Sequence, residues 1–189
     1  MAYLFRALVV YLVLLVFLFI SSSTTTTAAG ARELRINVKV TKSFVYEVCS
    51  QTRNINFCVD VLRSDPRTET SDLFGLGSIA NNLAIINATD TQNYITDLFN
   101  NATLDQKDHF HMCSLDYQFI ISDFKQAADK MRHSDYKETN TLAIDAINRA
   151  SDCENVFLSP PVIQSPLTQR NKNLGDLADI LAAVSKRLS

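Results

Sequence analysis

Apolar residues recur every three or four positions on both sides of a short polar segment, His133-Ser134-Asp135. This spacing places side chains on one face of a helix, so it predicts two amphipathic helices. Two helices joined by a tight turn run antiparallel. The core-facing positions of this predicted hairpin are Phe110, Cys113, Tyr117, Ile120, Ile121, Phe124, Ala127, Ala128 and Met131 before the turn, and Thr139, Leu142, Ala143, Ala146, Ile147, Ala150 and Cys153 after it.

A further long helix is predicted upstream of the hairpin. Ser71-Asp72 marks its start, because an acidic residue is favourable at the positive end of a helix. Asn100-Asn101 is predicted to break it. Thr103 and Gln106 then have the spacing of a capping box, which predicts the start of the next helix. The apolar stripe of the upstream helix comprises Leu73, Leu76, Ile79, Ala80, Leu83, Ile86, Ile95, Leu98 and Phe99.

The ends of the chain add shorter elements. Ile36 to Val48 and Phe57 to Leu62 are rich in β-branched residues, which also fit a strand, but we interpret both as helices because all that follows is helical. Asp65-Pro66 ends this pair, and the proline-rich connector from Ser159 to Pro166 cannot be helical. Leu174 to Leu188 is amphipathic again. The sequence predicts an all-α fold, an up-and-down four-helix bundle with a short N-terminal helical hairpin.

The four cysteines fit this arrangement as two disulfides. Cys113 and Cys153 are equidistant from the turn of the predicted hairpin, so a bond between them is geometrically natural. Cys49 and Cys58 flank a polar, turn-like stretch and can close a local loop. Four cysteines allow three pairings, of which the sequential one is the simplest. A zinc site is disfavoured, because no C-x-x-C or His-x-x-x-His pair accompanies the cysteines.

The N-terminal segment has the pattern of a secretory signal peptide. Arg6 precedes an apolar run from Ala7 to Ile20, and the small residues that follow end in Ala29-Gly30-Ala31. The run is shorter than the roughly 20 residues that span a bilayer, which disfavours a membrane anchor. We predict a signal peptide at residues 1–31, cut between positions 23 and 31, and a single domain at 32–189.

Secretion gives meaning to two glycosylation sequons, at Asn87 and Asn101. Removing residues 1–31 deletes one arginine and no acid, so the formal net charge changes from −2 to −3. This charge is too small to indicate nucleic acid or an anionic membrane as a partner.

Motifs for catalysis are missing from the sequence. There is no G-x-S-x-G, H-E-x-x-H or glycine-rich nucleotide loop, and the chain has only four glycines. Of these, Gly75 and Gly77 indicate close helix packing. We interpret His109 and His111 as surface histidines, and Asp116, Asp123 and Asp129 as a solvated face. No catalytic residue, metal, cofactor or small-molecule substrate is predicted.

The spacing of several short motifs resembles that of one known family. These motifs are Cys49-x8-Cys58, Val61-Leu62-x2-Asp65-Pro66, Asp72-Leu73, Cys113 with Tyr117, and Ser151-Asp152-Cys153-Glu154-x2-Phe157. They resemble the plant invertase and pectin methylesterase inhibitor family over nearly the whole mature chain. Within it, the similarity is greatest to the plane-tree pollen allergens described as invertase inhibitors, in Asp65-Pro66-Arg67, Asp72-Leu73-x-Gly75-Leu76-Gly77, Asn82-Leu83-Ala84-Ile85 and Ser165-Pro166-Leu167-Thr168.

The resemblance implies disulfides Cys49–Cys58 and Cys113–Cys153 and a secreted inhibitor in the cell wall (apoplast). It would form a 1:1 complex over the active-site cleft of a carbohydrate enzyme. Some invertase inhibitors insert a Pro-Lys-Phe tripeptide, which corresponds here to Tyr136-Lys137-Glu138. Since the Pro and Phe are absent, pectin methylesterase is the favoured target, with acid invertase, or a non-inhibitory interaction role, as the alternative. The candidate contact residues are His133, Tyr136, Lys137 and Glu138.

Overall fold

A computed structural model describes residues 42–189 of the chain. The predicted signal peptide and the start of the predicted helix Ile36 to Val48 lie outside the described residues. Within the described part the chain is helical, without strands. Its elements are α2 (Lys42–Cys49), α3 (Ile55–Ser64), the 3-10 helix η1 (Pro66–Thr70), α4 (Leu73–Asn101), α5 (Leu104–Arg132), α6 (Tyr136–Val156) and α7 (Thr168–Leu188).

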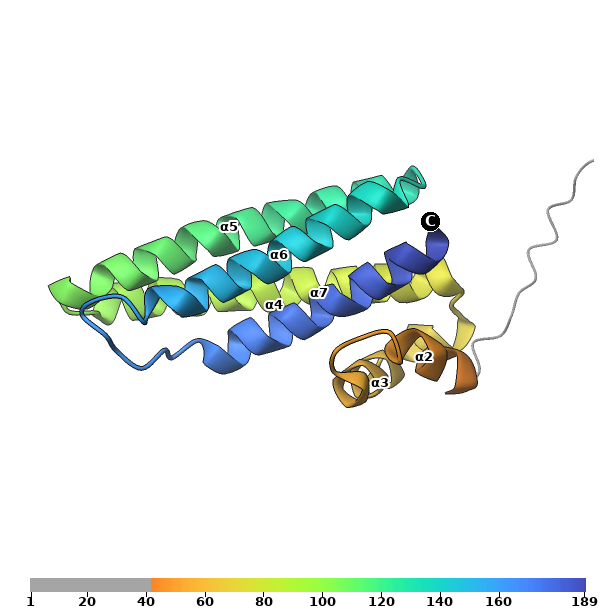
Figure 1. The fold of residues 1–189 in the computed structure, drawn as a ribbon, viewed down its shortest axis with the longest axis horizontal. Helices are drawn as coiled ribbons and strands as arrows, with labels where there is room; N and C mark the ends of the chain where they lie inside the picture. The colour runs from red at the N-terminus through yellow and green to blue at the C-terminus, as the bar shows by residue number, and fades with distance from the viewer. Residues whose placement is uncertain (1–41) are drawn as a thin grey trace, which may run out of the picture. The chain divides into compact units, whose positions relative to one another are not determined.

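The four long helices form the predicted up-and-down bundle. Each of α4, α5 and α6 packs against the next helix along the chain, and α7 closes the bundle against α4. The short hairpin of α2 and α3 packs against α7 at one end (Figure 1). None of the described helices is long and apolar enough to cross a membrane.

Local side-chain caps explain where the long helices begin. The Asp72 carboxylate accepts a hydrogen bond from the backbone N–H of Gly75 at 2.8 Å, and Asp135 accepts one from that of Glu138 at 3.3 Å. The Gln106 side chain accepts from the N–H of Thr103 at 3.4 Å. These contacts satisfy backbone donors that lack a partner within the helix. The predicted helix starts at Asp72 and Thr103 are confirmed, and the second helix of the predicted hairpin begins directly after Asp135.

The break after α4 comes slightly later than predicted. Asn100 and Asn101 still belong to α4, and the extended residues Ala102 and Thr103 separate it from α5. At the other end of α5, Ser134 has a positive φ of 59°. This left-handed residue reverses the chain between α5 and α6.

The predicted apolar stripes are largely the core. Seven of the nine positions on α5 are buried, while Ile121 and Ala128 are half-buried. On α6 the only half-buried position of the predicted stripe is Ile147. One prediction on α4 is wrong: Ile86 is 51% exposed. Ala84 and Ala88 are fully buried, and a residue two positions from each points to the opposite side of a helix.

Gly77 lies at a close contact between helices, as its residue type indicated. A Cβ atom there would lie 2.8 Å from the Met131 Cε of α5 and from the Val184 Cγ1 of α7. Gly75 has a different role, since its Cβ would meet the side chain of Ser71, just before the helix. Close interhelix packing is therefore confirmed for Gly77 alone.

Both disulfides have the sequential pairing. Cys49–Cys58 joins α2 to α3 with a Cα–Cα distance of 5.5 Å. Cys113–Cys153 joins α5 to α6 with a Cα–Cα distance of 4.6 Å. All four cysteines are fully buried. The second bond fixes the α5–α6 hairpin at a point far from its turn.

Candidate functional site

The four predicted contact residues lie together at the turn between α5 and α6. His133 and Lys137 are exposed, while Tyr136 and Glu138 are half-buried. The His133 ring Nδ1 lies 2.9 Å from the Asp129 backbone oxygen. Around the turn, Arg132 pairs with Asp129 at 2.8 Å and Lys130 with Asp135 at 3.4 Å. Exposed pairs of this kind add little stability. The turn between α5 and α6 is therefore a polar surface that a partner can reach.

A second candidate surface, which was not predicted from the sequence, consists of exposed apolar residues on the outward side of α5. Met112, Leu115 and Phe119 are 48%, 37% and 52% exposed. Their steps of three and four residues place them on one side of the helix. The guanidinium of Arg149, from α6, lies 4.4 Å from the centroid of the Phe119 ring. Their spacing in the sequence indicates this second apolar side, because it is helical and out of phase with the core stripe.

The side of α5 that carries these apolar residues continues, with polar residues, to the predicted contact residue His133. Ser122, Gln126 and Asp129 are exposed and follow Phe119 at helical steps that lead to His133. Leu115 and His133 are five helical turns apart and so share one side. We define the α5 outer face as Met112, Leu115, Phe119, Ser122, Gln126, Asp129 and His133. It spans about 32 Å along the axis at 1.5 Å per residue.

Carboxylates gather beside the α5 outer face where α5 meets α6. Burial, reinforced by the negative charge of Asp152, raises the pKa of Asp116 to about 6, against the opposing effect of Arg149. Asp123 is only 9% exposed, and its carboxylate lies 3.3 Å from the Arg149 Nε. Burial raises the pKa of Asp123 also, and Arg149 opposes the shift.

The prediction of a solvated acidic face therefore holds for Asp129 and is wrong for Asp123, which is buried, while Asp116 is half-buried. The prediction of two surface histidines is wrong for His109. Its side chain is 5% exposed and stacks on Phe157 with 5.5 Å between ring centroids. Its Nε2 lies 3.2 Å from the Ser159 backbone oxygen. The connector after α6 folds back over this ring, whereas His111 is exposed.

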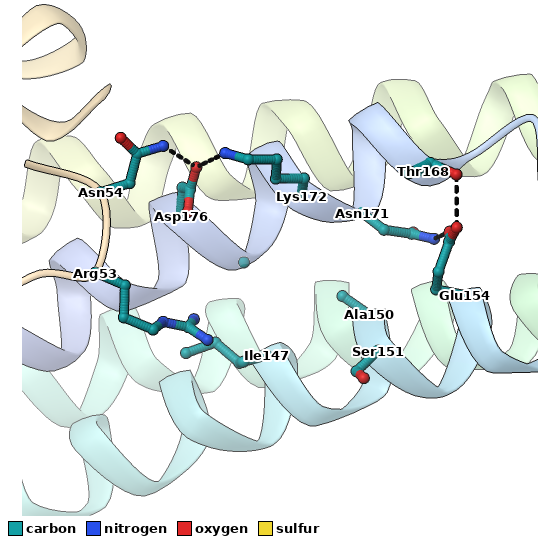
Figure 2. Close-up of a pocket in the computed structure, with 11 residues that line it drawn as sticks. Arg53, Asn54, Ile147, Ala150, Ser151, Glu154, Thr168, Asn171, Lys172 and Asp176 are labelled. Carbon is teal, nitrogen blue, oxygen red and sulfur yellow. Dashed lines mark hydrogen bonds and ion pairs between the residues drawn. The ribbon is translucent and has the colours of Figure 1, made fainter. Parts of the chain in front are cut away.

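A groove between α6 and α7 is a third candidate, and its polar side chains largely pair with one another (Figure 2). The Glu154 carboxylate accepts hydrogen bonds from Asn171 Nδ2 at 2.7 Å and Thr168 Oγ1 at 2.5 Å. Asp176 accepts from Asn54 Nδ2 and Lys172 Nζ, each at 2.7 Å. No histidine lines the groove. These hydrogen bonds join α6 to α7, and α7 to Asn54 just before α3.

The family model for plant invertase/pectin methylesterase inhibitors matches residues 43–184. The chain belongs to this inhibitor family. Some of its relatives are named as inhibitors of pectinesterase and others as inhibitors of invertase. The chain is 36% identical to "Pectinesterase inhibitor" of Actinidia deliciosa, covering 82% of this chain and 84% of the relative. It is 30% identical to "Putative invertase inhibitor" of Platanus acerifolia, covering 81% and 87%.

A further relative of this inhibitor-family chain is also named as an inhibitor. "Cell wall / vacuolar inhibitor of fructosidase 2" of Arabidopsis thaliana is 26% identical over 78% of this chain and 84% of the relative. A solved pectin methylesterase inhibitor from Arabidopsis, a mutant form A, superimposes with a TM-score of 0.68 at 19% identity, covering 75% of this chain and 95% of the other. This likeness supports the fold alone. The predicted family is confirmed, and it is a family of inhibitors and not of enzymes.

Asp116 gives this inhibitor-family chain a pH-dependent stability. A carboxyl group whose pKa is raised on folding stabilises the fold below its unfolded pKa of about 4, and that contribution is lost as pH rises to about 6. We expect Asp116→Asn to raise the free energy of unfolding by about 1 kcal/mol at pH 7.5, a value reduced because the side chain is half-exposed. At pH 4 the variant and the parent should be equal.

Thermal unfolding followed by circular dichroism at both pH values measures this difference. Asp90→Asn is the matched control, since Asp90 is an exposed carboxyl group in the middle of α4. An equal gain for Asp116→Asn at pH 4 and pH 7.5 would show that the burial of its charge is not the cause.

Proposed function

We propose that this protein is a secreted inhibitor of pectin methylesterase that binds its target one to one over the active-site cleft. The observation that carries the proposal is the 36% identity to the pectinesterase inhibitor of Actinidia deliciosa over most of both chains. A helical bundle crosslinked by two disulfides also suits stoichiometric binding, because a preorganised surface loses little conformational entropy on association.

We further propose that the α5 outer face and the adjoining turn contact the enzyme. Exposed apolar residues that adjoin one another within a polar surround are typical of protein interfaces. Here Leu115 and Phe119 would supply apolar contact area, and Arg149 would supply a planar charged group beside them. The exposed residues His133 and Lys137 would form the polar rim of the contact at the turn. The half-buried residues Tyr136 and Glu138 would contribute beside them.

Acid invertase is the second candidate target. The relatives named for invertase or fructosidase inhibition support it, and Lys137 occupies the position of the lysine in the Pro-Lys-Phe tripeptide. The residues on either side of it are Tyr136 and Glu138, where the tripeptide has Pro and Phe. We therefore rank this target below pectin methylesterase. A secreted interaction protein that has kept the fold and lost inhibition is the third possibility.

The proposed location is the cell wall, with residues 1–31 as the signal peptide and 32–189 as the inhibitor domain. N-terminal sequencing of the chain recovered from the medium of a plant secretory host tests this proposal. The first residue should correspond to a cut between positions 23 and 31. Retention of the whole chain inside the cell would contradict it.

The test of the target is a titration of both enzymes with the oxidised inhibitor. We expect pectin methylesterase activity to fall linearly to an end point near one molar equivalent. Acid invertase should keep its activity at micromolar inhibitor. Inhibition of invertase alone would replace the first target by the second, and inhibition of neither would leave the non-inhibitory role.

A further inference from the structure

The two glycosylation sequons lie in different structural settings. Asn87 is in the interior of α4, with the chain helical on both sides. Asn101 is the last residue of α4, and the next two residues are extended, with φ and ψ of −75° and 151° at Ala102 and −67° and 160° at Thr103. A sequon outside regular structure can present its asparagine and its hydroxyl residue together to a modifying enzyme.

The Asn87 side chain is half-buried in the folded chain. Its Oδ1 is buried and has no hydrogen-bond partner among the described residues. Asn87 lies on the side of α4 that faces α7: one turn on, Thr91 accepts from Arg170 Nη1 at 3.4 Å, and two turns on, the Tyr94 ring lies 4.6 Å from the Arg170 guanidinium. A sugar on the Nδ2 of the same amide would have to fit beside this contact.

The environment of Asn101 is open. Asn101 and Thr103 are both exposed. The Asn101 Nδ2 donates one hydrogen bond, to the Asp97 backbone oxygen at 2.8 Å. An amide nitrogen that carries a sugar still retains one hydrogen, so this bond is compatible with the modification.

We propose that Asn101 carries an N-linked glycan and that Asn87 is unmodified; this rests on the secreted location proposed above. In the transfer, Nδ2 of Asn101 forms a bond to the anomeric carbon of a lipid-diphosphate-linked oligosaccharide. Nδ2 loses one proton, and the lipid diphosphate leaves with the bonding electron pair. The glycan would then lie at the α4–α5 junction, at the opposite end of α5 from the turn that carries His133 (Figure 1).

The experiment is glycopeptide mapping by mass spectrometry of the full chain secreted by a plant host. We expect a hexose and N-acetylhexosamine mass on the peptide with Asn101, and an unmodified Asn87 in its own peptide. Asn101→Gln should remove the glycan from the intact mass, and the matched Asn87→Gln should retain it. The map of the unmutated chain gives the answer even where a variant folds poorly.

A glycan on Asn87, or on neither asparagine, would overturn the inference. Its outcome is separable from that of the proposed function, because inhibition is titrated on the same preparation. An inhibitor without a glycan on Asn101 overturns only the site, and a glycosylated chain that inhibits neither enzyme overturns only the function.

Discussion

Replacing Cys113 and Cys153 together by alanine should lower the free energy of unfolding by about 4 kcal/mol. The bond closes a sequence separation of 40 residues, and the entropy that a crosslink removes from the unfolded chain grows with loop length. Both cysteines are fully buried in the main core with Tyr117. Loss of the bond should therefore also loosen the contact between α5 and α6.

The matched control is the double replacement of Cys49 and Cys58. This bond closes a separation of only nine residues, so the same relation gives a loss of about 2.5 kcal/mol. Guanidinium unfolding followed by circular dichroism measures both variants against the parent. A larger loss for the Cys49/Cys58 pair would show that native-state packing around α2 and α3, and not loop length, determines the stabilisation.

The features that the sequence predicted well are those determined locally. Asp72, Thr103 and Asp135 cap helices through contacts with residues three positions away, so their roles do not depend on the rest of the fold. The core stripe of α5 is likewise a property of helical spacing. The disulfide across the hairpin followed from the position of its turn. Each of these inferences needed only residues close in sequence or symmetric about one turn.

Two of the three errors, those at His109 and Asp123, came from contacts between distant segments. His109 is buried because Phe157 and Ser159, about fifty residues later, fold over it. Asp123 is buried because Arg149 of α6 lies beside it. Ile86 is exposed because the small residues Ala84 and Ala88 occupy the packed side of α4. The residue types alone did not predict these outcomes.

The α5 outer face illustrates the same limit for function. Leu115 and Phe119 lie outside the predicted core stripe of α5, and their own apolar periodicity is out of phase with it. The packing of α4 and α6 on the other sides of α5 shows that these two residues remain exposed. Of the predicted contact residues, Tyr136, Lys137 and Glu138 came from a family tripeptide, and His133 came from its place at the predicted turn.

We expect Phe119→Asp to raise the inhibition constant for pectin methylesterase at least about 30-fold. The substitution removes an exposed aromatic ring at the middle of the α5 outer face and places a charge where the enzyme would contact apolar surface. Truncation of a central aromatic contact commonly costs about 2 kcal/mol or more of binding free energy, which is roughly this factor. Titration of enzyme activity at fixed substrate measures the constant.

Ile86→Asp is the control, because Ile86 is 51% exposed, close to the 52% of Phe119, and lies on α4. It should leave the inhibition constant unchanged, and both variants should keep the helical circular dichroism spectrum of the parent. Equal weakening by the two substitutions would place the contact elsewhere. Lys137→Ala separates the targets further: if invertase is the target, the substitution at the turn should weaken inhibition more than Phe119→Asp does.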